Sequence, residues 1–145
     1  MQYAEYAFAQ PSRTVGNPVA GAQAALAMDY IAGQLNTSPR WANIDAVTQL
    51  QLLEGRKQTR AVLGVVPNAP SQVVVNSLVV ARYNLAIGNE AGAAAALSNP
   101  AFTLPPTETI QRLANLPYIQ MANVSTTNAA QELQGPGGNG SDRVR

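Results

Sequence analysis

The chain has 145 residues, with nine Lys and Arg against eight Asp and Glu, and it contains neither histidine nor cysteine. This composition excludes a thiolate nucleophile, a histidine-based catalytic triad, an ordinary zinc site and an imidazole ligand for haem. The sparse, balanced charges give no basic footprint for nucleic acid, and no segment reaches the 18 or so apolar residues of a membrane span. We therefore expect a single non-enzymatic domain without cofactor, metal, transmembrane segment or nucleic-acid partner.

Residues 1–16 are predicted to form an extended N-terminal arm. Tyr3, Tyr6 and Phe8 precede a Pro-Ser-Arg-Thr-Val-Gly link that cannot continue a helix. These rings either pack onto the protein's own helices or dock into a partner, since interfaces favour aromatic anchors. Trp41, at the start of a later helix, either pins that helix corner or contacts a ligand or partner. We take all four as candidate partner-binding residues.

The start of the chain bears on localisation. Ala7-Phe8-Ala9 has the small-x-small pattern of a signal-peptidase site, but Met1 to Tyr6 contains neither a basic region nor an apolar run. The pattern is either the remnant of a misassigned start or a coincidence. We expect a periplasmic or otherwise exported protein, with a cytoplasmic location as the alternative.

Two helices are predicted before Gly64. Asn17-Pro18, an N-cap followed by proline at the first helical position, starts a helix that runs to about Leu35. The second begins between residues 39 and 44. Hydrophobic periodicity predicts the inward residues of the first as Val19, Ala22, Leu26 and Tyr30, and those of the second as Ala46, Leu50, Leu53 and Ala61.

Arg56, Lys57 and Arg60 are expected on a solvated face near the C-terminus of the second helix, where positive charge opposes the helix dipole; an acidic partner or a phosphate is the alternative.

The most apolar part of the chain predicts a helical hairpin over about residues 71–97. Ser71 can cap its first helix, and the inward residues recur at helical spacing as Val74, Leu78, Ala81 and Leu85. Gly88 and Asn89 then stop one helix and cap the next, whose alanine run predicts a second arm sandwiched between neighbours. Five valines between Gln72 and Ala81 leave a buried strand as the alternative for the first arm.

The remaining chain is predicted as short helices and a tail. Thr107 to Leu116 should form a helix with Ile110 and Leu113 inward, followed by a further turn through residues 118–121. A last short helix is expected to start at the caps in residues 125–128, where Asn128 and Gln131 resemble a capping box, and to end near residue 133. The Gly-rich residues 135–145 predict a flexible tail, which leaves 17–134 as the helical domain.

These elements predict an all-α fold, a compact bundle of five to six short helices around the central hairpin. We expect an accessory or interaction subunit that docks onto a larger protein or forms a homo-oligomer. One alternative is a binder of an apolar ligand such as lipid or quinone, in a cavity lined by Tyr30, Tyr83 or Tyr118; another is a carboxylate-based enzyme. In its small size, alanine richness and lack of His and Cys, the chain resembles small helical proteins of bacterial envelopes, and that resemblance implies an exported accessory subunit of a membrane-associated complex.

Overall fold

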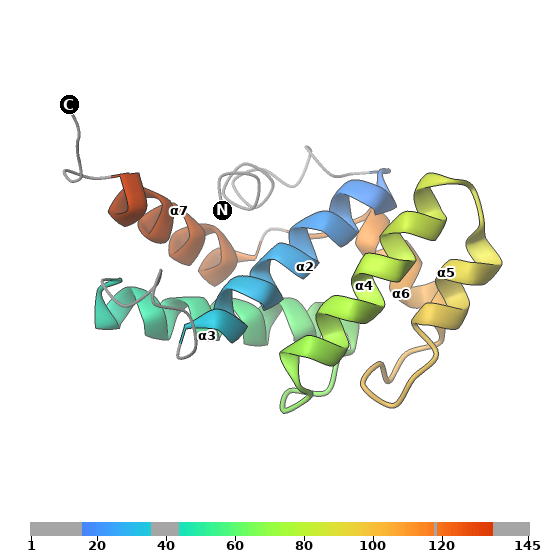
Figure 1. The fold of residues 1–145 in the computed structure, drawn as a ribbon, viewed down its shortest axis with the longest axis horizontal. Coiled ribbons are helices and arrows are strands. Elements are labelled where there is room, and N and C mark those ends of the chain that lie inside the picture. The colour runs from blue at the N-terminus through green and yellow to red at the C-terminus, as the bar shows by residue number, and fades with distance from the viewer. Residues whose placement is uncertain (1–15, 36–43, 118, 135–145) are drawn as a thin grey trace.

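The computed structural model describes residues 16–35, 44–117 and 119–134, and over these residues the fold is all-α (Figure 1). The six helices are α2 (Pro18–Gln34), α3 (Ala46–Leu63), α4 (Ser71–Ala86), α5 (Glu90–Ala96), α6 (Pro106–Ala114) and α7 (Gln120–Gln134). Within these ranges the only β-type pairing is an isolated bridge between Val65 and Phe102. The all-α prediction is confirmed, and the valine-rich segment is a helix rather than a strand. The predicted arm and tail lie outside the described residues.

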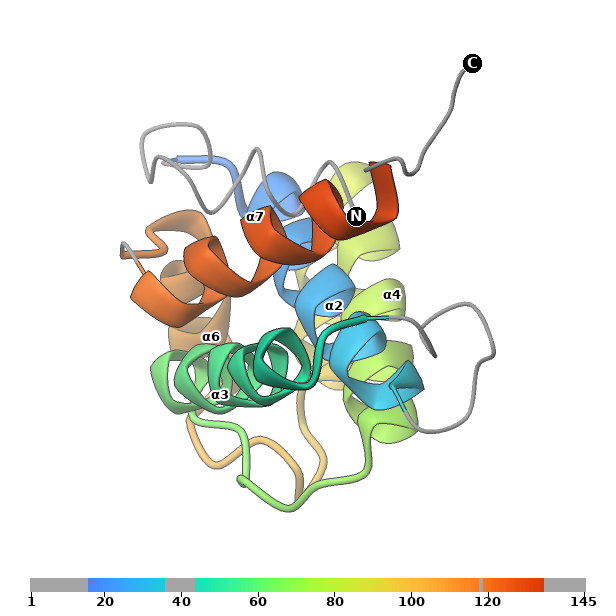
Figure 2. The same cartoon turned by 90° about the vertical axis from the view of Figure 1, so that its left-hand side faces the viewer.

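Helix α2 connects the two halves of the bundle. It contacts α3, α4 and α6, while α7 packs on α3 and α5 packs on α4. Figure 2 shows α2 between α3 and α4, with α7 lying over α3. A Cβ on Gly21 would stand 1.9 Å from the carbonyl oxygen of Leu113, so α2 and α6 touch backbone to backbone. The small residues of α2 therefore allow it to lie close to several neighbours.

The hairpin is present as predicted, and it is formed by α4 and α5. Gly88 adopts a positive φ of 79° after α4, a conformation that glycine reaches without strain. The Asn89 side chain then accepts a hydrogen bond of 3.0 Å from the Gly92 N–H and caps α5. Helix α5 lies between α4 and α6 and buries Ala93, but Ala91 and Ala95 are exposed, so the alanine run is covered on one side only.

The predicted inward side of α3 is wrong. Leu50 is 67% exposed, and Ala46, Leu53 and Ala61 are also exposed. The buried residues of α3 are instead Thr48, Leu52, Gly55, Thr59, Arg60 and Leu63. Part of this side faces α7, where a Cβ on Gly55 would come within 2.9 Å of the Met121 carbonyl oxygen. A glycine therefore lies at this point of the core because α7 approaches too closely for a larger residue.

Hydrogen bonds join α3 and α7 along the whole contact between the two helices. The Gln58 side chain accepts from the Met121 N–H at 3.1 Å, and the Asn128 side chain donates to the side-chain oxygen Oε1 of Gln51 at 2.8 Å. At the far end, Glu132 accepts from the Asp45 N–H at 2.7 Å and from the Thr48 hydroxyl. The order of these pairs shows that α3 and α7 are antiparallel. Because polar side chains make much of this contact, the sequence of α3 shows little apolar periodicity on the side that faces α7.

Two further predictions need correction. Residues 120–134 form one continuous helix rather than a turn followed by a short capped helix. Ser125 and Thr126 lie buried inside it, and the Thr126 hydroxyl donates to the Ala122 carbonyl oxygen at 2.6 Å, which satisfies its hydrogen bond without a helix end. On α2, Tyr30 is half exposed rather than inward, although Ala22 is buried as predicted.

Candidate interaction surface

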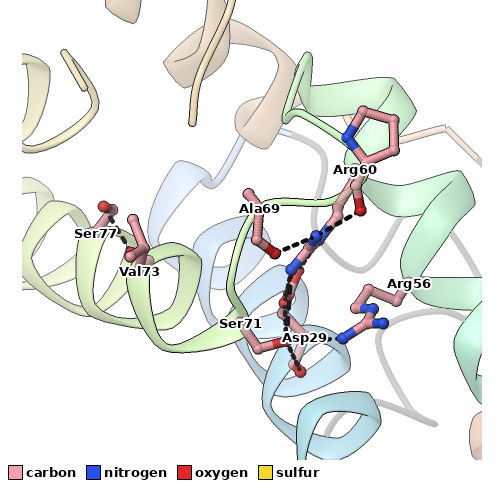
Figure 3. Close-up of polar contacts among 8 residues, drawn as sticks. Asp29, Arg56, Arg60, Ala69, Ser71, Val73 and Ser77 are labelled. Atoms are coloured by element: carbon pink, nitrogen blue, oxygen red, sulfur yellow. Dashed lines mark hydrogen bonds and ion pairs between the residues drawn. The ribbon is translucent and has the colours of Figure 1, made fainter. Parts of the chain in front are cut away.

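A buried polar cluster holds α2, α3 and α4 in fixed positions (Figure 3). Arg60 from α3 and Asp29 from α2 are 2% and 3% exposed. The Arg60 Nε donates to Asp29 Oδ2 at 2.8 Å, and its Nη2 donates to Asp29 Oδ1 at 2.6 Å. This paired geometry is the strongest that an arginine and a carboxylate can adopt. We call Asp29, Arg56, Arg60 and Ser71 the polar cluster.

All five N–H donors of Arg60 have acceptors. Besides Asp29, the guanidinium donates through Nη1 to the carbonyl oxygens of Pro67 and Ala69, at 2.9 and 2.7 Å, and through Nη2 to the Ser71 hydroxyl at 3.4 Å. Pro67 and Ala69 belong to the connection between α3 and α4. Arg60 therefore fixes the chain just before α4 begins, and a buried charge that is fully hydrogen-bonded is tolerated in a core.

Ser71 joins the first turn of α4 to the rest of the polar cluster through hydrogen bonds. Its hydroxyl donates to Asp29 Oδ1 at 2.8 Å and accepts from Arg56 Nη1 at the same distance. Because this hydroxyl is engaged, Ser71 is the first residue of α4 rather than its predicted cap, and Pro70 occupies the N-cap position without a side-chain hydrogen bond. Gly33 of α2 makes the close approach possible, since a Cβ there would lie 2.7 Å from the Ser71 Cβ.

The polar cluster carries one more positive than negative charge, and this excess affects the pKa of Arg56. Burial lowers the pKa of Arg56, the neighbouring Arg60 charge lowers it further, and the Asp29 carboxylate raises it. The sequence placed Arg56, Lys57 and Arg60 together on a solvated face. That prediction is wrong for Arg60, which is buried against Asp29, and it holds for Lys57, which is exposed.

With its start fixed, α4 turns one side to the core. Val74, Ser77, Leu78 and Ala81 are buried, as the spacing predicted for three of them, and Leu85 is partly buried against the core. On the α5 side, the Asn99 side chain donates to the Ser77 hydroxyl at 2.9 Å. Among the described helices, only α2 and α5 pack extensively on α4, and neither covers its opposite side.

That opposite side is apolar. Ile87 lies two and a half turns from Leu78 and therefore on the other side of the helix. The exposed fractions are 41% for Val73, 49% for Val80, 63% for Tyr83 and 59% for Ile87, and Asn76 is also exposed. These five residues recur at alternating steps of three and four, the spacing of positions that face a partner in a coiled coil. We call Val73, Asn76, Val80, Tyr83 and Ile87 the α4 stripe.

Helix α4 is apolar nearly all round. Arg82 is the one charged residue among its 16 residues. A helix of this kind in a globular protein is normally covered on all sides, whereas a helix with one solvated side carries charged residues there. Val79 at the edge of the stripe is also exposed and extends the apolar surface. The composition of α4 thus fits a helix with a partner on its outward side.

The outward side of α3 differs from the α4 stripe. Val47 and Leu50 are strongly exposed at its N-terminal end, but the same line continues with Glu54 and Lys57, both exposed. The apolar surface there is less than half the length of the helix. The α4 stripe is interrupted only by the uncharged Asn76, which accepts a hydrogen bond of 2.9 Å from the Gln72 side chain.

A half-open pocket of about 320 Å³ lies where α2 ends and α4 begins. Its lining residues are Tyr30, Gly33, Gln34, Ser71, Gln72 and Val75. Tyr30 was a predicted lining residue for an apolar ligand, but amide and hydroxyl groups line most of this pocket. Tyr83, the second such residue, points outward in the α4 stripe, and Tyr118 lies outside the described residues.

The predicted partner-binding residues Tyr3, Tyr6, Phe8 and Trp41 also lie outside the described residues, so they stay predictions. The sequence analysis missed the α4 stripe, although a signal for it exists. The valine run has two helical lines, one through Val74 and Leu78 and one through Val73 and Val80. The first line predicts the inward side of the helix. The second line, at heptad spacing, indicates a second contact surface.

No protein-family model matches the chain, and no curated protein or solved structure is significantly similar to it. Among the described helices, none is both long and apolar enough to cross a membrane. In the same residues, no group of three or more acidic side chains lies together where it could hold a metal ion.

Proposed function

We propose that the protein is a non-enzymatic helical interaction subunit that binds another helix through the α4 stripe. The observation that carries the proposal is the outward side of α4, which presents four large apolar side chains in one line along a helix with a single charge. Monomeric soluble proteins rarely expose a continuous apolar patch of this kind without an interaction partner. A helix laid along the stripe would cover it in the manner of a helix bound in a groove or seam.

The polar cluster supports this role by making the surface rigid. Because Arg60 and Ser71 fix the start of α4, and Leu78 and Ala81 anchor its middle, the stripe is held in one orientation before any partner binds. A preorganised surface loses less conformational entropy on binding than a mobile one. The same cluster uses its polar groups within the fold, so its function is to position α4.

Site-specific photo-crosslinking tests the proposal. A benzoylphenylalanine in place of Tyr83 lies in the stripe, and one in place of Gln111, exposed on α6, is the matched control. In extracts of the source cells we expect adducts from the first position that map to an apolar helical segment, and far fewer from the second. Excess unlabelled wild-type protein should abolish these adducts, and the Val80→Glu variant should not. Equal labelling from both positions would contradict the proposal.

The N-terminal aromatics give a second, independent contact in this proposal. Tyr3, Tyr6 and Phe8 would act as further anchors for the partner, because three large rings on a nearly neutral protein favour association. Removal of residues 1–12 should weaken assembly while circular dichroism shows unchanged helicity. A loss of helicity would place these rings in the core instead.

A further inference from the structure

We infer that the helix bound by the α4 stripe is α4 of a second copy of this chain, paired in parallel; this inference rests on the proposed function. Its basis is the order of side chains along the stripe. Val73, Val80 and Ile87 occupy one heptad position, conventionally named a, and Asn76 and Tyr83 occupy the other, named d. All three a positions are β-branched, which is the choice that favours parallel two-stranded pairing.

Asn76 selects the parallel register. When two parallel copies of the stripe meet, each residue faces its own equivalent, so the two Asn76 amides face each other and can exchange hydrogen bonds. An antiparallel pair would place each Asn76 against Val80 or Ile87 and leave its amide in an apolar contact. A buried amide without a hydrogen-bond partner is costly, so pairing of the two Asn76 amides favours the parallel register.

No charge opposes self-pairing. The exposed residues that flank the stripe are Gln72, Val79 and Ala86, and Asn84 beside them is half-buried; all four are uncharged. Charged residues at these positions normally set which helix is chosen as partner. Their absence removes like-charge repulsion between two copies, and it also offers nothing that would favour a charged heterologous helix over a second copy. Tyr83 can keep its hydroxyl at the solvated rim while its ring packs against the other copy.

The size of the surface predicts a weak dimer. From Val73 to Ile87 the stripe is about 21 Å long, and a helix with its side chains is about 10 Å wide. This contact falls short of the roughly 800 Å² per partner of a standard stable interface, even when Val79 is added at its edge. We therefore expect association in the range of transient interfaces, visible at high micromolar concentration.

Sedimentation velocity of the purified full chain over a wide concentration series tests the association. We expect a monomer–dimer equilibrium for the wild type, and a decrease in dimer affinity of about a hundredfold or more for Val80→Glu and for Val80→Lys, since each brings like charges together at the centre of the interface. An equimolar mixture of the two variants should recover association, because position 80 of one copy then faces the opposite charge on the other. Circular dichroism controls for folding.

Cysteine crosslinking tests the register, and the natural chain contributes no thiol that could interfere. Asn76→Cys and Ile87→Cys should each form a disulfide-linked dimer under mild oxidation, and Gln111→Cys should stay monomeric. In an antiparallel pair, neither would crosslink alone, but a mixture of Asn76→Cys with Ile87→Cys, or of Asn76→Cys with Val80→Cys, would.

The outcomes separate this inference from the proposed function. A chain that stays monomeric at every concentration, or association that Val80→Glu leaves unchanged, would overturn the second-copy inference. Crosslinking in the antiparallel pattern would overturn it as well. In each of these cases, specific adducts from position 83 to a different protein would still support the stripe as the binding surface.

Discussion

Helices α3 and α4 are similar in length and both carry an apolar line, but they place that line differently. Helix α3 turns Val47 and Leu50 outward and buries Thr48, Gly55 and Thr59, whereas α4 has apolar residues on both its inward and its outward sides. Apolar periodicity thus identifies a helix without identifying its buried side. The deciding factors on α3 are the close approach of α7 and a set of specific polar bonds.

The largest expected effect comes from the polar cluster that links the two helices. Arg60→Met removes the guanidinium and leaves the Asp29 carboxylate buried with only Ser71 as a hydrogen-bond donor. The free energy of unfolding should fall by about 3 to 5 kcal/mol, as for other buried ion pairs broken on one side. Chemical denaturation of the variant and the wild type measures the difference.

Two further variants make this result specific. Lys57→Met, one turn away and exposed, should change stability by less than about 0.5 kcal/mol. Replacing both partners, as Asp29→Leu with Arg60→Met, should recover much of the loss, because no charge is then left unpaired in the core. If Arg60→Met proved as mild as Lys57→Met, α4 would not depend on the cluster for its position.

The sequence could predict which segments are helical and how two of the helices, α2 and α5, begin. Asn17 and Asn89 are N-caps as predicted, and Gly64 and Gly88 follow helix ends with positive φ. These features depend on a few neighbouring residues. The Arg60–Asp29 pair joins residues 31 positions apart, and neither partner differs in sequence from a solvated charge. The one hint is that Asp29 is the only charged residue in α2.

The inward side of α3 could not be predicted for a related reason. Gly55 and Thr48 are unremarkable in a hydropathy profile, and they face the core because α7 places Ser125 against Gly55 and Glu132 against Thr48. Their burial therefore depends on another segment of the chain. The α4 stripe was missed because a single apolar line is enough to account for a helix in a monomeric bundle.

A smaller but more instructive effect is expected within α3. Gly55→Ala adds one methyl group that would meet the Met121 carbonyl oxygen at 2.9 Å and the Ala122 Cα at 3.1 Å. Overpacking of this kind costs about 1 to 3 kcal/mol, more than the gain in helix propensity from glycine to alanine. Thermal unfolding measures it. Leu50→Ala on the outward side removes a larger group, yet it should cost less than about 0.5 kcal/mol.

This pair of variants tests the orientation of α3 directly. If Leu50→Ala destabilised the protein more than Gly55→Ala, the outward side of α3 would be the buried one, and the predicted inward line of Leu50 and Leu53 would be correct after all. The test requires dilute protein, so that any contact between copies does not contribute to the result.

Arg56 should behave opposite to Arg60. Its folded-state pKa is lowered by burial and by the Arg60 charge, so the unfolded chain holds the proton more readily and the charged form opposes folding at neutral pH. Arg56→Met should therefore raise the free energy of unfolding slightly, by less than about 1 kcal/mol for this partly exposed side chain. The gain should be constant between about pH 5 and 9, because arginine stays protonated there in both states. A loss of stability would show that the bond from Arg56 to Ser71 outweighs the repulsion.

The smallest effect separates the two outward sides. Leu50→Gln on α3 and Val80→Gln on α4 each replace an exposed apolar residue by a polar one of good helix propensity, so each should change the stability of the dilute protein by less than about 0.5 kcal/mol. The two variants should differ only at concentrations at which copies of the chain associate. Leu50 stands in a line that the charged Glu54 and Lys57 interrupt, whereas Val80 is the middle of a stripe of five uncharged residues, four of them apolar, so sedimentation at high concentration should show weaker association for Val80→Gln alone. Weaker association for Leu50→Gln instead would move the interaction surface from α4 to α3.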